Sequence, residues 1–312
     1  MVLSSNSAPF VSVLLPCSSD DYLDECINSI LGQTFNDFEI ILVLNGVLRD
    51  KTAEFQRRYS HFAKKISIYS CSESGIVPAL NLGISKSQGE IIARMDADDL
   101  MVPDRLSLQV KAFKGDVNLV AVGGQIIKMG PSGVIAHPRY PLTHKDTLYS
   151  LNRSTSLPHP GTSIRKESLK QIGGYRNRYP FVEDWDLWLR LSEIGEIYNI
   201  PEEVIIYKLH PNQTSSLKST EQLENASKML RDRLKFLVKT NLVKKKISVE
   251  SLNQIRYACG GFLLAFSRSR ENSSIWGKIP YLFIAALIDP LILFKGVNLR
   301  LKRAQKLFHK HV

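Results

Sequence analysis

The sequence predicts an α/β protein with a doubly wound, mostly parallel central sheet, followed by a helical and basic C-terminal extension. Three observations support this prediction. Short apolar runs alternate with amphipathic stretches over the first hundred or so residues, polar or acidic residues directly follow three of these runs, and cationic residues are concentrated towards the C-terminus. Alternating strands and helices are typical of a parallel sheet covered by helices on both faces, and such sheets bind ligands at the carboxyl ends of their strands.

The first strand and the first helix are both clear in the sequence. Val11–Leu15 is an apolar run, and we expect the strand to stop at Pro16. Asp20 and Asp21 then provide the cap and the first-turn charge of a helix, and Gly32 follows its last turn. The apolar face of this helix consists of Leu23, Cys26, Ile27, Ile30 and Leu31, which recur at helical spacing.

The alternation continues as far as a group of acidic residues. Glu39–Leu44 is a nearly continuous apolar run, as expected of a central parallel strand, and it ends at Asn45. The next elements are expected to be a helix over Asp50–Tyr59, a short strand over Ile66–Tyr69 and a helix over Val77–Ser85. A further apolar run ends in the acidic group. This βαβαβαβ order places Pro16, Asn45 and the acidic group at one edge of the sheet.

The acidic cluster, defined as Asp96, Asp98 and Asp99, has two interpretations. Its carboxylates repel one another, and their oxygens are hard ligands that suit Mg²⁺ or Mn²⁺. Alternatively, Asp98 or Asp99 caps the helix that begins near Pro103 and Asp104. Capping accounts for one carboxylate and leaves the other two unexplained, which favours a metal site.

The central part of the chain mixes helices, strands and loops. We expect a helix near Asp104–Phe113, a strand at Leu119–Gly123, a helix near Thr143–Leu151, a loop at Leu157–Gly161 and a strand at Val204–Tyr207. His159 lies in the loop, and His210 follows the last strand. A lone histidine in such a position is more often structural than a ligand, so position alone assigns neither residue a role.

A helix with an acidic first turn is predicted near residue 183. Glu183, Asp184 and Asp186 fall in that turn, where the positive end of the helix dipole stabilises acids. Dipole stabilisation is one explanation of the three acids. Because Trp185 and Trp188 frame them, the pattern also fits a walled pocket in which a carboxylate acts as a base.

Length, cysteine content and charge limit the class of protein. With 312 residues, 44% of them hydrophobic, the chain can form one large domain and an appendage. Its four cysteines show no paired spacing, and no secretory signal is evident, which favours a reducing, cytoplasmic location. The net charge of +11 is uneven: residues 231–312 hold 17 Lys and Arg against 4 Asp and Glu, whereas residues 1–230 hold 24 against 26.

The basic C-terminal part is expected to be helical and to meet an anionic surface. Helices are predicted over Thr220–Leu242 and Ser248–Ser267. The apolar run Tyr281–Phe294 has 14 residues, which is shorter than a membrane-spanning helix of about 20 residues. Flanked by cations, this run fits a segment that lies in a bilayer interface; a helical lid on the domain and a nucleic-acid binder are the alternatives. Because the helical, basic part begins near Thr220, we predict two domains, at residues 1–218 and 219–312.

Two nucleotide-binding motifs are absent from the sequence. No G-x-G-x-x-G follows the first strand, and no G-x-x-x-x-G-K-[ST] occurs. Binding of nicotinamide dinucleotides and P-loop nucleotide hydrolysis are therefore disfavoured.

A series of short motifs covers residues 10–216. In order, these are Val11–Pro16, Ser29–Phe35, Glu39–Gly46, Ala79–Ile84, Gly89-Glu90, Asp96–Asp99, Gly161–Arg165, Gly173–Tyr175, Glu183–Arg190 and Tyr207–His210. Each motif is weak by itself. Together and in this order, they resemble the family 2 inverting glycosyltransferases of bacteria, which have a GT-A type fold.

The resemblance implies an enzyme that moves a sugar from a nucleotide-sugar donor, with UDP-sugars favoured. It implies a divalent Mn²⁺ or Mg²⁺ ion on Asp96 and Asp98, and His210 matches a histidine that helps hold the metal or the diphosphate in some members. Asp184, with Glu183 beside it, matches the catalytic base. Residues 1–218 then form the catalytic domain.

The resemblance also suggests which side chains line the site. The expected donor contacts are Pro16, Ser18, Asn45, Asn81, Asp96 and Asp98. The acceptor side is expected to include Asp99, Trp185, Trp188 and His159. The expected acceptor is a saccharide or lipid-linked saccharide in the synthesis of cell-surface polysaccharide. The basic tail would hold the enzyme peripherally at the inner face of the cytoplasmic membrane, and no nucleic-acid partner is expected.

Two other functions remain open at this stage. A sugar-1-phosphate nucleotidyltransferase would need a Gly-rich, basic signature to cradle a triphosphate, and Pro16–Leu23 contains no Gly, Lys or Arg. A non-catalytic, membrane-bound member of the family would have no reason to keep the acidic cluster together with Asp184 and His210.

Overall fold

The computed structural model describes residues 8–211, 213, 218–243, 259 and 262–263. The chain divides into two compact units. The first comprises the chain up to Leu148 together with Thr155–Arg178 and Glu183–Gln213, and the second comprises Tyr149–Ser154, Tyr179–Val182 and the chain from Thr214. The domain boundary expected at residue 218 remains a prediction.

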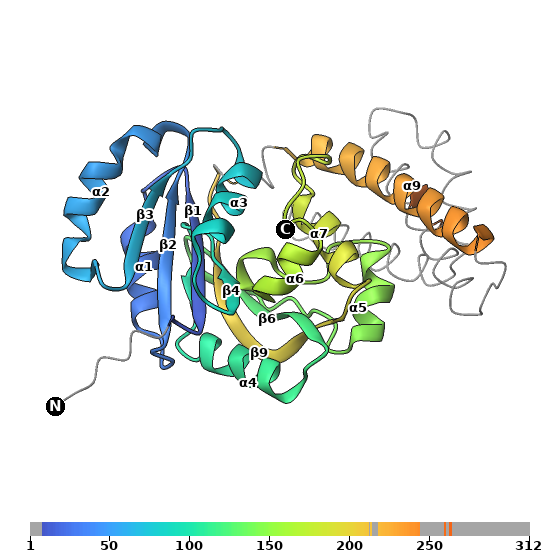
Figure 1. The fold of residues 1–312 in the computed structure, drawn as a ribbon, viewed down its shortest axis with the longest axis horizontal. Coiled ribbons are helices and arrows are strands. Elements are labelled where there is room, and N and C mark those ends of the chain that lie inside the picture. Colours follow the sequence, from blue (N-terminus) through green and yellow to red (C-terminus); the bar gives the residue numbers. More distant parts are fainter. Residues whose placement is uncertain (1–7, 212, 214–217, 244–258, 260–261, 264–312) are drawn as a thin grey trace, which may run out of the picture. The chain divides into compact units, whose positions relative to one another are not determined.

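The first unit is built on a nine-stranded sheet (Figure 1). Its strands pair in the order β3-β2-β1-β4-β8-β6-β9-β5, and β7 pairs with β6. The strands are β1 Val11–Cys17, β2 Phe38–Leu44, β3 Ile66–Ser70, β4 Ile91–Arg94, β5 Leu100–Met101, β6 Leu119–Gly130, β7 Gly133–Ala136, β8 Ser163–Arg165 and β9 Glu196–Lys208.

The helices of the described chain follow the expected order, except that α6 was not predicted. They are α1 Leu23–Leu31, α2 Thr52–Arg58, α3 Ile76–Lys86, α4 Arg105–Gly115, α5 His144–Leu151, α6 Lys166–Gln171, α7 Glu183–Leu191 and α9 Ser219–Val243, with short 3-10 helices η1 Gly46–Lys51, η2 Ser60–Phe62 and η3 His159–Gly161. Strand β1 is parallel to β2 and β4, β2 is parallel to β3, and β6 is parallel to β9. Strand β8 is antiparallel to β4 and β6, β5 to β9 and β7 to β6, but the longer pairings are the parallel ones. The predicted βαβαβαβ start and a mixed, mostly parallel sheet are thus confirmed.

Side chains of β1 alternate between the two faces of the sheet, as the period of a strand requires. Val13 belongs to the core that contains Ile27 of α1 and Leu106 of α4. Leu14 points to the opposite face, where a Cβ built on Gly83 of α3 would lie 2.0 Å from its Cδ1 atom. Glycine therefore lets α3 approach the sheet closely. Helices cover both faces, which confirms the doubly wound arrangement.

The strand β1 is longer than predicted, because it does not stop at Pro16. The parallel register continues with Pro16 opposite Val43 and Cys17 opposite Leu44. Proline removes one donor from the ladder. The carbonyl of Cys17 nevertheless accepts a hydrogen bond from the backbone N–H of Asn45 at 2.8 Å, so pairing persists beyond the proline.

The second half of the sheet was predicted less well. Strand β6 was expected to end at Gly123 and runs to Gly130, while β9 begins at Glu196 rather than Val204. Glycines in an apolar run indicated a break, but here they accompany a shift of register in the β6–β9 ladder between Gly123 and Gln125. A glycine inside a strand often marks such an irregularity, and the strand continues past it.

Arg105, the first residue of α4, fixes the framework around the strand ends. Its side chain is fully buried and donates hydrogen bonds to the carbonyl oxygens of Arg94 at 2.7 Å, Pro160 at 2.8 Å and Thr162 at 3.4 Å. Burial lowers the pKa of Arg105 to about 9. Through these bonds, one side chain ties the end of β4 to the loop that precedes β8.

The second unit contains α9, which confirms the helix predicted over Thr220–Leu242. Its buried residues Ala226, Met229 and Leu230 recur at helical spacing, and Asp232 accepts a hydrogen bond from the hydroxyl of Tyr179 at 2.9 Å. Within the described residues, no helix combines the length and the apolar character needed to cross a membrane. The predictions for Tyr281–Phe294 and for most of Ser248–Ser267 lie outside the described residues.

Candidate active site

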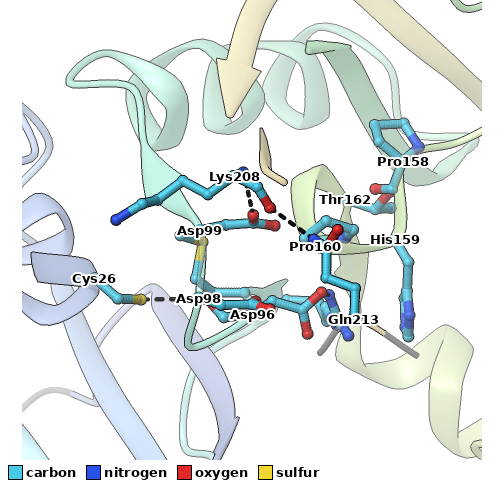
Figure 2. Close-up of polar contacts among 12 residues, drawn as sticks. Cys26, Asp96, Asp98, Asp99, Pro158, His159, Pro160, Thr162, Lys208 and Gln213 are labelled. Carbon is cyan, nitrogen blue, oxygen red and sulfur yellow. Dashed lines mark hydrogen bonds and ion pairs between the residues drawn. The ribbon is translucent and has the colours of Figure 1, made fainter. Parts of the chain in front are cut away.

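The acidic cluster lies directly after β4 (Figure 2). One carboxylate oxygen from each of Asp96, Asp98 and Asp99 lies within 4.8 Å of the others. The Nε2 atom of His210 lies 2.7 Å from Oδ2 of Asp98, although the two residues are 112 positions apart in the chain. The structure therefore brings together the residues that were predicted to hold a metal.

Strand pairing explains why these distant residues meet. Leu100 of β5, which follows the acidic cluster, pairs antiparallel with Ile206 of β9. The residues after β9 are consequently held beside the cluster. The backbone N–H of Lys208 donates to Oδ1 of Asp99 at 3.0 Å, and the side chain of Gln213 donates to the carbonyl oxygen of Lys208 at 2.6 Å (Figure 2).

The acidic cluster is not explained by helix capping. The residue that precedes α4 is Asp104, so neither Asp98 nor Asp99 occupies the cap position. Asp99 has no exposed surface, and its Oδ2 atom is buried without a hydrogen-bond partner among the described residues. A buried carboxylate oxygen without a partner is costly, and a nearby cation would remove that cost.

The charges around the cluster also favour a cation. Burial raises the pKa of Asp96, the guanidinium of Arg94 lowers it, and the Asp98 carboxylate raises it. Burial also raises the pKa of Asp99, and the carboxylates of Asp96 and Asp98 raise it further. A divalent cation would act in the opposite direction on both groups. An oxygen-rich set completed by an imidazole fits Mn²⁺ and also accepts Mg²⁺.

The second acidic group lies at the start of α7. Asp184 accepts a hydrogen bond from the backbone N–H of Trp185 at 2.7 Å and a longer one from the hydroxyl of Thr155 at 3.4 Å. Burial raises the pKa of Asp184. For Glu183, burial and the adjacent Asp184 carboxylate raise the pKa to about 7, and its Oε2 atom is buried without a hydrogen-bond partner among the described residues.

The third acid of this helix, Asp186, is paired with two arginines. Asp186 forms ion pairs with Arg176 at 2.6 Å and Arg190 at 2.9 Å. Its charge is therefore already balanced by two guanidinium groups. The helix-dipole interpretation explains an acid that is exposed in the first turn, whereas Glu183 and Asp184 are partly buried and their pKa values are raised.

Replacing Glu183 with Gln tests the pKa of this side chain. The carboxyl ionises near pH 4.5 in the unfolded chain and near 7 in the folded protein, so folding favours its protonated form. Stability should fall as pH rises through this window. We expect Glu183→Gln to raise the free energy of unfolding at pH 8 by up to about 2 kcal/mol and to leave it unchanged at pH 4.

Urea unfolding of both proteins across pH 4–8 measures this difference. The exposed Glu73, changed to Gln, serves as the control and should show the same pH dependence as the unchanged protein. A pH-independent difference for Glu183→Gln would contradict the assignment of a raised pKa.

Arg94 connects the two acidic groups electrostatically. Its side chain is buried at the end of β4, and its guanidinium forms an ion pair with Asp96 at 2.5 Å. The same guanidinium lowers the pKa of both Glu183 and Asp184, although burial is the larger influence on each. The cluster after β4 and the acids of α7 thus share one buried cation.

The predicted donor contacts near β1 and β2 lie at the carboxyl ends of the strands. Pro16 is buried within β1, and the exposed Ser18 lies beside Gly46, where a Cβ would be 3.8 Å from the Cβ of Ser18. Asn45 accepts a hydrogen bond from the N–H of Gly46 at 2.7 Å and donates one to the carbonyl of Gly75 at 2.5 Å. Asn45 therefore shapes the loops at these strand ends.

Asn81 lies in α3 and supports a turn on another part of the chain. Its side chain donates to the carbonyl of Tyr175 at 2.9 Å and accepts from the N–H of Tyr175 at 3.0 Å. The preceding Gly174 has φ 68°, and a Cβ there would lie 2.7 Å from Oδ1 of Asn81. The amide that was expected to contact the donor is thus engaged with the backbone.

The residues predicted on the acceptor side differ in their exposure. The Nε2 atom of His159 lies 2.8 Å from the hydroxyl oxygen of Tyr175, and its ring packs edge-on against Trp188. Burial lowers the pKa of His159 well below its usual range, which favours the neutral ring. Trp188 and Asp99 have no exposed surface, and Trp185 is 7% exposed. The acceptor-side role of these residues remains a prediction; in this structure Trp188 packs against His159, and Asp99 accepts a hydrogen bond from the backbone N–H of Lys208.

Three residues that organise the site were not predicted from the sequence. Arg94 is a lone cation in the apolar run before the acidic cluster, a pattern that signals a buried partner for those acids. Tyr175 follows a Gly-Gly pair, and Arg105 lies in an ordinary amphipathic helix. For these two residues, no local signal distinguishes a buried hydrogen-bonding role from an exposed one.

A mostly parallel sheet with helices on both faces and carboxylates at the strand ends is the GT-A architecture. The mannosyltransferase PcManGT from Pyrobaculum calidifontis, in complex with GDP-Man and Mn²⁺, is similar to this chain with a TM-score of 0.60 and 16% sequence identity, covering 97% of this chain and 84% of that one. S. aureus TarS 1–349 in complex with UDP-GlcNAc has a TM-score of 0.57 and 17% identity, covering 83% and 82%. At these identities, the similarity concerns the fold.

Sequence relatives identify the family. The model of "Glycosyl transferase family 2" matches residues 12–173. A glycosyltransferase of Haemophilus influenzae is 31% identical over 265 residues, which are 80% of this chain and 81% of the relative. The O-antigen biosynthesis glycosyltransferase WbnJ of Escherichia coli is 32% identical over 228 residues, covering 72% and 88%. The chain belongs to glycosyl transferase family 2, which confirms the predicted resemblance and leaves the nucleotidyltransferase alternative without support.

Proposed function

We propose that this glycosyltransferase moves one sugar from a nucleotide-sugar donor, with UDP-sugars favoured, to a saccharide or lipid-linked saccharide and inverts the anomeric centre. One observation carries the proposal: His210 meets the acidic cluster at the strand ends, and Arg94 links that cluster electrostatically to the acids of α7. Two differently placed acidic groups are what donor activation and acceptor activation require.

The residues that would hold the divalent ion are Asp98, Asp96 and His210. Asp99 lies behind them, where its buried carboxylate would add negative charge to the site. When bound, Mn²⁺ or Mg²⁺ supplies Lewis-acid neutralisation of the diphosphate that leaves the sugar. Arg94 favours the ionised form of Asp96, because the two side chains form a partly buried ion pair.

Asp184 is the proposed base, with Glu183 beside it. The acceptor hydroxyl oxygen forms a bond to C1 of the sugar, the bond from C1 to the diphosphate oxygen breaks, and the hydroxyl proton passes to the Asp184 carboxylate. Attack from the face opposite the diphosphate inverts the anomeric centre. A pKa near neutrality suits a group that must accept a proton at physiological pH, and burial moves the pKa of both acids in that direction.

The relatives support the proposed class of donor and acceptor. The solved neighbours were captured with UDP-GlcNAc or with GDP-Man and Mn²⁺. WbnJ acts in O-antigen biosynthesis, and the relative AmsE of Erwinia amylovora, 26% identical over 181 residues, acts in amylovoran biosynthesis. We extend the proposal to peripheral attachment at the inner face of the cytoplasmic membrane, on the basis of the basic and apolar sequence of the tail.

A screen of UDP-, GDP- and dTDP-sugars tests the donor class directly. A ligand that binds the folded protein raises its melting temperature, by an amount that depends on concentration and affinity. We expect one nucleotide class, led by UDP, to raise the melting temperature in the presence of Mn²⁺ and to have a smaller effect with EDTA. Equal responses to all donors with and without Mn²⁺ would contradict metal-assisted donor binding.

A further inference from the structure

The segment that carries His210 is fastened at several points after β9 ends. The backbone N–H of Leu209 donates to the carbonyl of Met129 at 2.7 Å, which continues the pairing with β6. Gln213 then closes a turn, because its side chain donates to the carbonyl of Lys208 at 2.6 Å. These bonds fix the backbone of the segment. They do not fix the direction of the Lys208 and His210 side chains.

Tyr22, at the start of α1, contacts both of those side chains. The Nζ atom of Lys208 lies 4.4 Å from the centroid of the Tyr22 ring. The ring of His210 is 5.4 Å from the Tyr22 ring, centroid to centroid, with 38° between the planes. Lys208 also forms an ion pair with Glu25 of α1 at 2.7 Å, but Glu25 is 63% exposed, so water screens that pair.

The Tyr22 side chain is not needed to start the helix. Its residue occupies the cap position of α1 without any side-chain cap hydrogen bond, and its carbonyl oxygen accepts from the N–H of Cys26 at 3.1 Å. The backbone of Tyr22 thus provides the contact that starts α1. The ring is left to pack against the segment after β9, where one face of an aromatic ring favours a cation such as the Lys208 ammonium.

We propose that Tyr22 is a positioning residue for the metal site: its ring holds the side chains of Lys208 and His210 in place, so that the His210 imidazole meets Asp98. This inference rests on the proposed role of His210 as a metal ligand. Replacing a residue that orients a ligand typically weakens metal binding by about 10–100-fold, because an unsupported imidazole must be ordered when the ion binds.

The test measures Mn²⁺ affinity from the electron paramagnetic resonance signal of the free ion, with no nucleotide present. Tyr22→Ser removes the ring and supplies a residue favoured at a helix cap, so α1 is preserved. We expect Tyr22→Ser to weaken Mn²⁺ binding by about tenfold and His210→Ala by at least as much. Tyr22→Phe should bind as the unchanged protein does, because it retains the ring.

A double variant shows whether Tyr22 affects Mn²⁺ binding through His210 or independently of it. If Tyr22 acts through His210, Tyr22→Ser combined with His210→Ala should bind Mn²⁺ no more weakly than His210→Ala alone. The control is Tyr69→Ser on β3, where Lys86 lies 5.6 Å from the ring centroid in a comparable contact, and its affinity should be unchanged.

Each contrary result has a distinct meaning. If His210→Ala weakens binding and Tyr22→Ser does not, or if the two effects add fully, the inference about Tyr22 is wrong and the proposed function stands. If His210→Ala leaves Mn²⁺ affinity unchanged, the assignment of His210 within the proposed function is wrong, and the role of Tyr22 at the metal is lost with it.

Discussion

Replacing Asp98 with Asn is expected to lower the rate of sugar transfer by about 10³-fold or more. Asp98 is the member of the acidic cluster that contacts His210, at 2.7 Å, and its side chain is 32% exposed, so an ion and a diphosphate can reach it. Asn removes one charge and one ligand oxygen while keeping the shape. Loss of several kcal/mol of charge stabilisation at the leaving diphosphate corresponds to a rate change of this size.

Transfer of a radiolabelled sugar at saturating Mn²⁺ measures the loss of rate. The Kd for Mn²⁺, measured separately, gives the loss of metal affinity. Asp37→Asn is the matched control, because Asp37 is exposed and precedes β2, at the opposite end of that strand from Asn45. Its transfer rate should be unchanged. An Asp98→Asn variant that retains wild-type Mn²⁺ affinity and rate would remove Asp98 from the metal site.

The second large effect is expected from replacing Asp184 with Asn. Asn cannot accept the proton of the acceptor hydroxyl, and loss of a general base costs about 10²–10⁴-fold in rate. Donor binding should persist, since Asp184 is not among the proposed metal ligands. The Asp184→Asn variant should therefore lose turnover. In the presence of Mn²⁺, the donor should still raise its melting temperature by nearly the same amount as in the unchanged protein.

Asp146→Asn provides the control for the helix-dipole interpretation. Asp146 also lies in the first turn of a helix, α5, and it is exposed. If Asp184 only stabilised its helix, the two variants would lose similar amounts of stability and both would retain turnover. Near-normal transfer by Asp184→Asn would exclude it as the base and reopen the alternative of a non-catalytic member.

The N-terminal half of the fold could be read from sequence because its signals are local. Residues 11–94 alternate between apolar runs and amphipathic stretches, and each element has an identifiable start or end. The last part of the sheet lacks such signals. Strand β8 has three residues, and β5 has two, so each depends on partners rather than on its own pattern. Tertiary pairing decides these short strands.

In the candidate site, too, features that depend on neighbouring residues were predictable, and contacts between distant residues were not. The acidic cluster was found because three carboxylates after an apolar run are unusual in any protein. The contact of His210 with Asp98 required the β5–β9 pairing, which periodicity did not predict. The role of Arg94 also depended on burial, since the sequence does not show that its guanidinium faces acids from two parts of the chain.

The hydrogen bonds of Arg105 limit how this enzyme can be diversified. His159 is predicted to lie on the acceptor side, and swapping the segment around it for that of another family member would test this prediction. Here the carbonyls of Pro160 and Arg94 share one guanidinium, so a foreign segment with a different backbone path would also disturb the end of β4. Exchanges that preserve the backbone at Pro160 should therefore yield active chimeras, and others should lose activity.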